Sequence, residues 1–175
     1  MTVWVSPEDD IEFRQVELHN LSDRSLDIEL ISAFEVTLSE PRADEAHPAF
    51  TNLFVDAEWL ASHQAILFGR KPRLATEEGL KMAHFLTGAT SQVVRVRWAV
   101  DRQEWQGRNR GSSQPLASFD TAPGVSADQS RALDTGLDPV CALSVKLQIA
   151  AYATARLTFA TAVSTSSEIL RAMID

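Results

Sequence analysis

Alternation of apolar and polar residues at period two is the dominant pattern in this chain. It is clearest from Leu26 to Leu38, where the even positions are almost all apolar and most odd positions are polar. Such a set would scatter around a helix but lines one face of a strand, so it predicts a long strand with one buried face. Ile31 and Ala33 interrupt the polar side, and we therefore expect part of that second face to be covered as well.

Shorter segments of the same character surround this strand. The run Ile11–His19 ends in a tight polar connection and is predicted to pair with the long strand as an antiparallel hairpin. Residues 42–50 are predicted to be a polar loop, and residues 102–139 lose the pattern. Further strands are predicted at residues 52–59, 65–70, 80–86, 93–101, 141–149 and 157–163, the last two as partners. No helical pattern is interleaved, which predicts an all-β fold, an antiparallel β-sandwich.

The period changes at the C-terminal end of the chain. Thr165 and Glu168 have the spacing of a capping box, and apolar residues then follow at helical spacing. The sequence therefore predicts a β-sandwich domain over residues 1–164 and a short C-terminal helix, the start of a linker, over residues 165–175.

Composition narrows the classes of function. A chain of 175 residues is long enough for one domain with a proper core. Its formal net charge of -8 argues against nucleic acid and anionic membrane surfaces as partners. Cys141 is the single cysteine, so no intrachain disulfide can form, and we expect no leader or membrane-spanning segment from the sequence given. We expect a cytoplasmic protein without a membrane segment.

Few residues suggest catalysis. Glu8, Asp9 and Asp10 could be the paired carboxylates of a glycosidase, but adjacent residues point in opposite directions, and an acidic turn is the favoured interpretation. The four histidines have no ligand-like spacing, so no metal and no cofactor are expected. Cys141 lies on the apolar face of a predicted strand, where it should be an inert core residue.

Two short segments carry candidate contact residues. Trp105, Arg108 and Arg110 combine an aromatic ring with guanidinium groups on a glycine-containing turn, which suits contact with a carbohydrate or a phosphate. A structural turn or an interdomain salt bridge is the alternative, and the acidity of the chain disfavours RNA. His47, Pro48 and Phe50 should lie at the rim of a sheet, either exposed or as a buried histidine beside an apolar plug.

Several segments together resemble the amino-terminal β-sandwich domain of glycoside hydrolase family 94. They are WVSPEDDIEFRQVELHN, DEAHPAFTNLFVDAEWL, ILFGRKPR, AHFL, VDRQEWQGRNR and LDPVCALSVKLQI, in the family's order. Within that family the similarity points to cyclic β-1,2-glucan synthases and β-1,2-oligoglucan phosphorylases. The chain departs from the family pattern at Asn109, where a glycine is usual, and in Ala150–Ala155, where a Pro-Gly turn is expected.

The resemblance implies a partial galactose mutarotase-like supersandwich, with further strands before Trp4 and an (α/α)6 barrel after the helix near Ser166. In the family that barrel holds the catalytic aspartate, so we expect no catalysis from this chain alone. The implied role is a non-catalytic accessory domain that shapes a carbohydrate site and supports a homodimer. The resemblance also implies that His47, Pro48 and Phe50 make interdomain or dimer contacts.

Two other functions remain open at this stage. The chain could be a free-standing carbohydrate-binding module, for which Trp59, Trp98 and Trp105 would be the aromatic residues to inspect. It could also be a structural fragment that associates with itself through unpaired strand edges. A β-glucan or oligosaccharide is the expected ligand, bound together with a catalytic barrel.

Overall fold

Two antiparallel sheets packed face to face form the body of the protein, in a computed structural model that describes residues 1–72, 79–89, 91–107, 109–111 and 129–175. One sheet has seven strands in the order β1-β2-β10-β6-β5-β4-β8, and the other has three in the order β3-β9-β7. The strands are β1 (Thr2–Val5), β2 (Ile11–His19), β3 (Leu26–Glu35), β4 (Val55–Leu60), β5 (Ala65–Arg70), β6 (Lys81–Thr87), β7 (Val93–Asp101), β8 (Arg131–Leu133), β9 (Pro139–Ile149) and β10 (Thr154–Ser164). The predicted all-β sandwich with a short C-terminal helix is confirmed.

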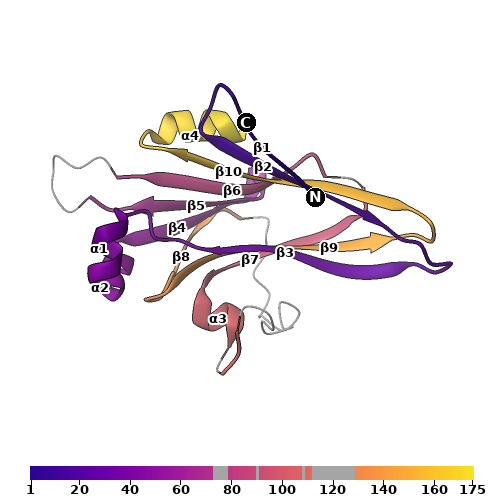
Figure 1. The fold of residues 1–175 in the computed structure, drawn as a ribbon, viewed down its shortest axis with the longest axis horizontal. Coiled ribbons are helices and arrows are strands. Elements are labelled where there is room, and N and C mark those ends of the chain that lie inside the picture. The colour runs from indigo at the N-terminus through magenta and orange to yellow at the C-terminus, as the bar shows by residue number, and fades with distance from the viewer. Residues whose placement is uncertain (73–78, 90, 108, 112–128) are drawn as a thin grey trace.

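Helices lie outside both sheets (Figure 1). They are α1 (Pro41–Ala46), α2 (Pro48–Asn52), α3 (Arg102–Gln106) and α4 (Ser167–Ile174), with a short 3-10 turn, η1 (Ala61–His63), between β4 and β5. In Figure 1, α4 lies over the seven-stranded sheet, α3 lies below the three-stranded sheet, and α1 with α2 closes one end. The result is a sandwich with a helix on each outer face.

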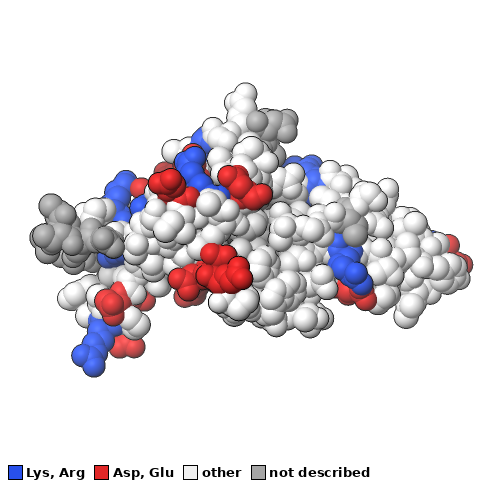
Figure 2. Space-filling view, turned by 90° about the horizontal axis from the view of Figure 1, so that it is seen from above, with Lys and Arg blue, Asp and Glu red and all other residues white. Residues whose placement is uncertain are grey.

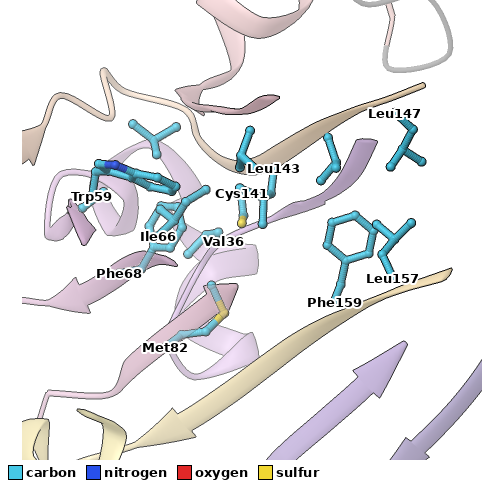
Figure 3. Close-up of a cluster of buried hydrophobic side chains, with 14 of the residues drawn as sticks. Val36, Trp59, Ile66, Phe68, Met82, Cys141, Leu143, Leu147, Leu157 and Phe159 are labelled. Atoms are coloured by element: carbon cyan, nitrogen blue, oxygen red, sulfur yellow. The ribbon is translucent and has the colours of Figure 1, made fainter. Parts of the chain in front are cut away.

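The main core fills the space between the two sheets (Figure 3). Trp59, Ile66, Phe68 and Met82 come from the large sheet, and Cys141, Leu143 and Leu147 come from β9 in the small one. Cys141 is fully buried, and burial raises the pKa of its thiol well above the ordinary value, which confirms its interpretation as a core residue.

The long predicted strand is β3, but it ends at Glu35, three residues before the predicted end at Leu38. Val36 still enters the core at 3% exposure, and Leu38 turns the chain with a φ of 48°. The prediction that its polar face is partly covered is confirmed, because Ile31 packs with Trp105 of α3 against the outer side of the small sheet. Ala33 stays exposed.

Both predicted hairpins were wrong. β2 pairs with β1 and β10, whereas β3 pairs with β9, so the connection from β2 to β3 crosses from one sheet to the other. The turn from β9 to β10 makes the same crossing in reverse, because β10 pairs with β2 and β6. Period-two alternation identifies a strand with one buried face, but not the sheet to which it belongs.

The remaining differences are local. Residues 42–50, predicted as a loop, form most of α1 and α2, each of which starts with a proline suited to the first helical turn. The cap of α4 is Ser166, whose hydroxyl accepts from the Ile169 N–H, rather than Thr165. Leu170 and Ile174 are the buried residues of α4, and they pack onto the large sheet. None of the helices in the described ranges is long and apolar enough to span a membrane.

Candidate functional site: a helical rim at one end of the sandwich

Four segments meet at one end of the sandwich, and we call this region the rim. It consists of the helical pair α1–α2, the end of β3, helix α3 and the loop of residues 134–138 that leads into β9. The Asn52 side-chain amide donates to the Leu137 carbonyl at 3.1 Å, and the Thr135 hydroxyl donates to the Val55 carbonyl at 3.1 Å. These contacts fasten the loop to the helical pair and to β4, so the rim is one assembly.

Arg102 joins three of these segments. Its backbone N–H donates to the Asp138 carbonyl at 3.0 Å, and its Nε lies 2.9 Å from the Asp138 carboxylate. One guanidinium nitrogen also lies 2.7 Å from the carboxylate of Glu35 at the end of β3. The hydrogen bond to Glu35 raises the pKa of Arg102 further, so the guanidinium is a permanent cation between two anions. Arg102 therefore holds the end of β3, α3 and the loop together.

Asp101 and Gly136 fix the start of α3. The Asp101 carboxylate caps the helix by accepting from the Gln103 N–H at 2.7 Å. Gly136 has a φ of +59°, and a Cβ at that position would lie 2.5 Å from the Asp101 carboxylate. A glycine is required there by both backbone conformation and space. Through Arg102 and Asp138, the segments VDRQEW and LDPV, quoted above from the sequence, are in direct contact.

Trp105 lies beneath the rim and is only 6% exposed. It packs against Val140 and Ala142 on the outer face of β9, and its indole nitrogen has no hydrogen-bond partner among the described residues. The ring is therefore covered in this structure, where a sugar-stacking ring would need an open face. Its evident contribution is to hold α3 against the small sheet.

The two arginine candidates of that segment are not buried beside Trp105 in the part of the chain that the structure describes. Arg108 lies outside the described residues, and Arg110 is exposed. Asn109 has a φ of 61°, in the left-handed region that asparagine adopts more readily than most residues. The departure from the family's glycine at this position is therefore compatible with the same turn.

His47, Pro48 and Phe50 all lie on the surface of the helical pair. His47 ends α1 and precedes α2: its N–H donates to the Ala43 carbonyl, and its own carbonyl accepts from the N–H groups of Phe50 and Thr51. Its side chain is exposed, so the alternative of a buried structural histidine does not hold. Phe50 is 45% exposed and meets Phe54 edge to face, with ring centroids 5.3 Å apart.

Sequence reasoning missed two exposed apolar residues of the rim. Leu53 is 55% exposed at the end of α2, and Leu137 is 67% exposed in the loop that Asn52 holds. Leu53 was predicted to belong to a strand over residues 52–59, whereas β4 starts only at Val55, and Leu137 lies in the segment without a pattern, so the local sequence distinguishes neither residue from a core residue. Arg102 was also missed, although its place in the VDRQEW segment was a usable signal.

The tryptophans proposed for a carbohydrate-binding module do not form an open platform. Trp59 is fully buried, and Trp98 stacks on it with ring centroids 3.8 Å apart. Among the described residues, no group of three or more histidine, cysteine, aspartate or glutamate side chains is placed to hold a metal ion. What the rim offers is a rigid surface with exposed apolar side chains.

The fold defines a class: a two-sheet antiparallel β-sandwich with short helices outside the sheets. Residues 1–175 match the family model described as "Glycosyl hydrolase 94, supersandwich domain", and the chain belongs to that family. Over 130 residues, 74% of this chain, it is 28% identical to the cyclic beta-(1,2)-glucan synthase NdvB of Rhizobium meliloti (strain 1021). That alignment covers 5% of the synthase, so the chain corresponds to a small part of this relative.

Proposed function

We propose that this chain is a non-catalytic accessory β-sandwich of a glucan phosphorylase or cyclic β-1,2-glucan synthase, and that its rim docks onto a catalytic (α/α)6 barrel. Residues 1–164 would be the sandwich and residues 165–175 the start of the linker to the barrel. In this role the domain shapes one wall of the carbohydrate site and supports a homodimer. The proposed setting is the cytoplasm.

The observation that carries this proposal is the exposure of Phe50, Leu53 and Leu137 on one rigid rim. These side chains are 45%, 55% and 67% exposed, while the backbone around them is fixed by hydrogen bonds and by the Arg102 ion pairs. Apolar side chains held rigidly at a surface lose little conformational entropy when a partner covers them. Exposed apolar patches with a polar surround are a feature of protein interaction sites.

The proposal is tested by measuring binding of the purified chain to the catalytic barrel of a family member that has been expressed without its own sandwich. Saturable binding is expected, and Phe50→Ser combined with Leu137→Ser should weaken it at least tenfold, as expected for central contacts. Leu21→Ser is the matched control, because Leu21 is 86% exposed but lies in the connection between β2 and β3. Equal binding by all three proteins would reject the rim as the docking surface.

The carbohydrate contact is a separate part of the proposal and has its own test. Arg110 is exposed on the turn after α3, where it could reach a sugar or phosphate bound by the barrel. Titration of the docked complex with β-1,2-gluco-oligosaccharides, with cellobiose for comparison, should show weaker binding for Arg110→Ala and no change in docking. Strong binding of these glucans by the isolated chain would instead favour a carbohydrate-binding module.

A further inference from the structure

A groove lies on the outer face of the large sheet, beside α4. Its volume is about 540 Å³, within the range of small-molecule binding sites. Strands β4, β5 and β8 form its floor, and α4 forms one wall. These strands lie at the β8 side of the large sheet, whereas β1 lies at the other side. Figure 2 shows the face of the molecule that bears α4, where acidic and basic residues lie in small groups over a largely uncharged surface.

The register of the strands explains why the floor is hollow. Asp56, Gly69 and Lys81 form one row across β4, β5 and β6, while Ala132 of β8 lies beside Glu58 of β4. The two carboxylates point outward, because they alternate with the buried residues of β4. Gly69 has no side chain, and a Cβ there would lie 2.6 Å from a carboxylate oxygen of Asp56. The glycine and the alanine therefore leave open space between charged side chains.

The wall of the groove is fixed relative to its floor. The Lys81 ammonium donates to the Thr165 carbonyl, just before α4, at 2.9 Å. Leu170 of α4 is 2% exposed and packs onto the large sheet. At the other end of the helix, the Asp175 carboxylate lies 2.7 Å from Nε2 of His63 in η1. Because α4 is held at both ends and in the middle, the groove is formed before any ligand binds, as most small-molecule sites are.

Polar groups of both charges surround an apolar part of the floor. Asp56 and Glu58 offer carboxylate oxygens as acceptors, and Lys71 and Arg171 offer donors. Half-buried Leu67 lies between the strands and the helix. Because the opposite charges are mixed, the groove has no strong preference for an ionic ligand. A neutral ligand with many hydroxyl groups suits it better, since each hydroxyl can donate to a carboxylate and accept from a cation.

We propose that this groove binds a gluco-oligosaccharide, at a second site formed by different elements from the rim. A pyranose ring combines a rim of hydroxyl groups with a face of C–H groups, which can cover the apolar part of the floor. The choice of a glucan among neutral polyhydroxyl ligands rests on the proposed function, whereas the groove itself does not. In Figure 1 the groove's helix, α4, and the contact segment at α3 lie on opposite outer faces of the sandwich. The groove would therefore hold a glucan away from the carbohydrate site that the domain shapes with the barrel.

Binding by the groove alone should be weak. Among its described lining residues the aromatic one is Phe68, which is 1% exposed and offers no ring face for stacking on a sugar. A weak site of this kind is distinct from the strong binding that would mark a free-standing carbohydrate-binding module. It would add to affinity when a second part of the same glucan is bound elsewhere in the assembly.

Titration of the isotope-labelled chain with β-1,2-gluco-oligosaccharides, followed by backbone amide NMR shifts, tests the site. Saturable shifts are expected at Glu58, Gly69 and Arg171, and none are expected in α1 or α2. Inorganic phosphate is the comparison ligand and should neither cause these shifts nor displace the glucan. Glucan shifts confined to other residues, no glucan shifts at all, or phosphate shifts at the groove without glucan shifts would each overturn the proposal.

Substitutions in the groove test which groups bind. Glu58→Ala and Arg171→Ala each remove a polar group and should weaken glucan binding about fivefold. Ala132→Leu fills the floor without removing a polar group and should weaken binding in the same way, with unchanged circular dichroism. Glu168→Ala is the matched control, because Glu168 is exposed on α4 but does not line the groove. Unchanged binding in the three groove variants, or equal loss in the control, would reject the groove.

The rim variant separates this proposal from the proposed docking. Phe50→Ser with Leu137→Ser should bind the glucan as the wild type does, because neither residue lines the groove. Glucan binding at the groove without any docking to the barrel would reject the proposed docking and keep the groove. Docking without shifts at the groove would reject the groove and keep the docking.

Discussion

The side-chain amide of Asn20 donates a 3.1 Å hydrogen bond to the carbonyl of Ile149, at the end of the sandwich opposite the rim. The same amide also reaches the carbonyls of Arg24 and Ala150, each at 2.8 Å, and its oxygen accepts from the N–H and hydroxyl of Ser22. Asn20 is 2% exposed and belongs to the connection from β2 to β3, while Ile149 precedes the connection from β9 to β10. The Asn20 side chain thus links the two connections by which the chain crosses between the sheets.

Replacing Asn20 should be among the most damaging single changes in the chain. Asn20→Ala removes the amide that donates to the carbonyls of Arg24, Ile149 and Ala150, and it should lower the free energy of unfolding by about 2–3 kcal/mol. Asn20→Asp should cost more at neutral pH, because a carboxylate would face carbonyl oxygens. Urea unfolding measures both, with Leu21→Ser as a control that should change stability by less than about 0.5 kcal/mol. An Asn20→Asp protein as stable as the wild type would contradict a stabilising role for the Asn20 hydrogen bonds.

A substitution in the turn between β9 and β10 should increase the stability of the protein. Tyr152 has a φ of 58°, a conformation that side chains with a Cβ disfavour, and its ring is 73% exposed. Tyr152→Gly should therefore raise the free energy of unfolding by about 1 kcal/mol, because glycine adopts this conformation without strain. The comparison is Asn109→Gly, at a φ of 61°, which should gain much less because asparagine tolerates that region. Thermal unfolding of the two variants distinguishes the cases, and a destabilised Tyr152→Gly would show that the exposed ring matters.

Alternation identified most strands but not their arrangement. The predicted ranges for residues 65–70 and 93–101 match β5 and β7, since each strand has an alternating or apolar pattern bounded by turn residues. The predicted pairing of strands was wrong at the two connections that Asn20 joins. Short polar connections have similar sequences whether they join neighbouring strands in one sheet or cross between two sheets. The contact between Asn20 and Ile149 accompanies the crossing, and their separation of 129 residues along the chain hides it from local sequence patterns.

The site was predictable only as far as its residues are local. The sequence placed the His47–Phe50 segment at the rim of a sheet but left a buried histidine open as an alternative, and the exposure of His47 in the structure decides between the two. The burial of Trp105 did not follow from the sequence, because it depends on Val140 and Ala142 of a distant strand. The exposure of Leu137 was not predictable either, because its loop is fastened by Asn52 at the Leu137 carbonyl and by Arg102 at the Asp138 carbonyl, and these are contacts between remote segments.

Trp105 should contribute to the folding stability of the chain. Trp105→Ala would leave a cavity under α3 and should lower the free energy of unfolding by about 3 kcal/mol. Arg110→Ala is the matched change in the same segment and should have little effect, because Arg110 is exposed. Chemical denaturation followed by circular dichroism measures both. A Trp105→Ala protein with wild-type stability but weakened glucan binding would instead make the indole a ligand contact.

His84 is the buried histidine among the residues that the structure describes. Its ring is 1% exposed and lies between the sheets, edge to face with Phe34 and nearly parallel to Phe159, while Nδ1 is 3.0 Å from the Thr161 hydroxyl. Among the described residues its Nε2 has no hydrogen-bond partner. Burial, and secondarily the positive charge of Arg14, lower the pKa of His84 from 6.5 to about 4.

This shift predicts loss of stability in mild acid. The unfolded chain takes up the His84 proton near pH 6.5, whereas the folded chain resists it until about pH 4. Stability from this group is therefore complete above the unfolded pKa and falls as the pH drops through that window, by roughly 3 kcal/mol in total. Urea unfolding at a series of pH values should show this slope, and His84→Leu should flatten it between pH 6.5 and 4. His19→Gln, at an exposed histidine, should leave the slope in place. A His84→Leu protein that keeps the full wild-type slope would assign the acid sensitivity to other groups.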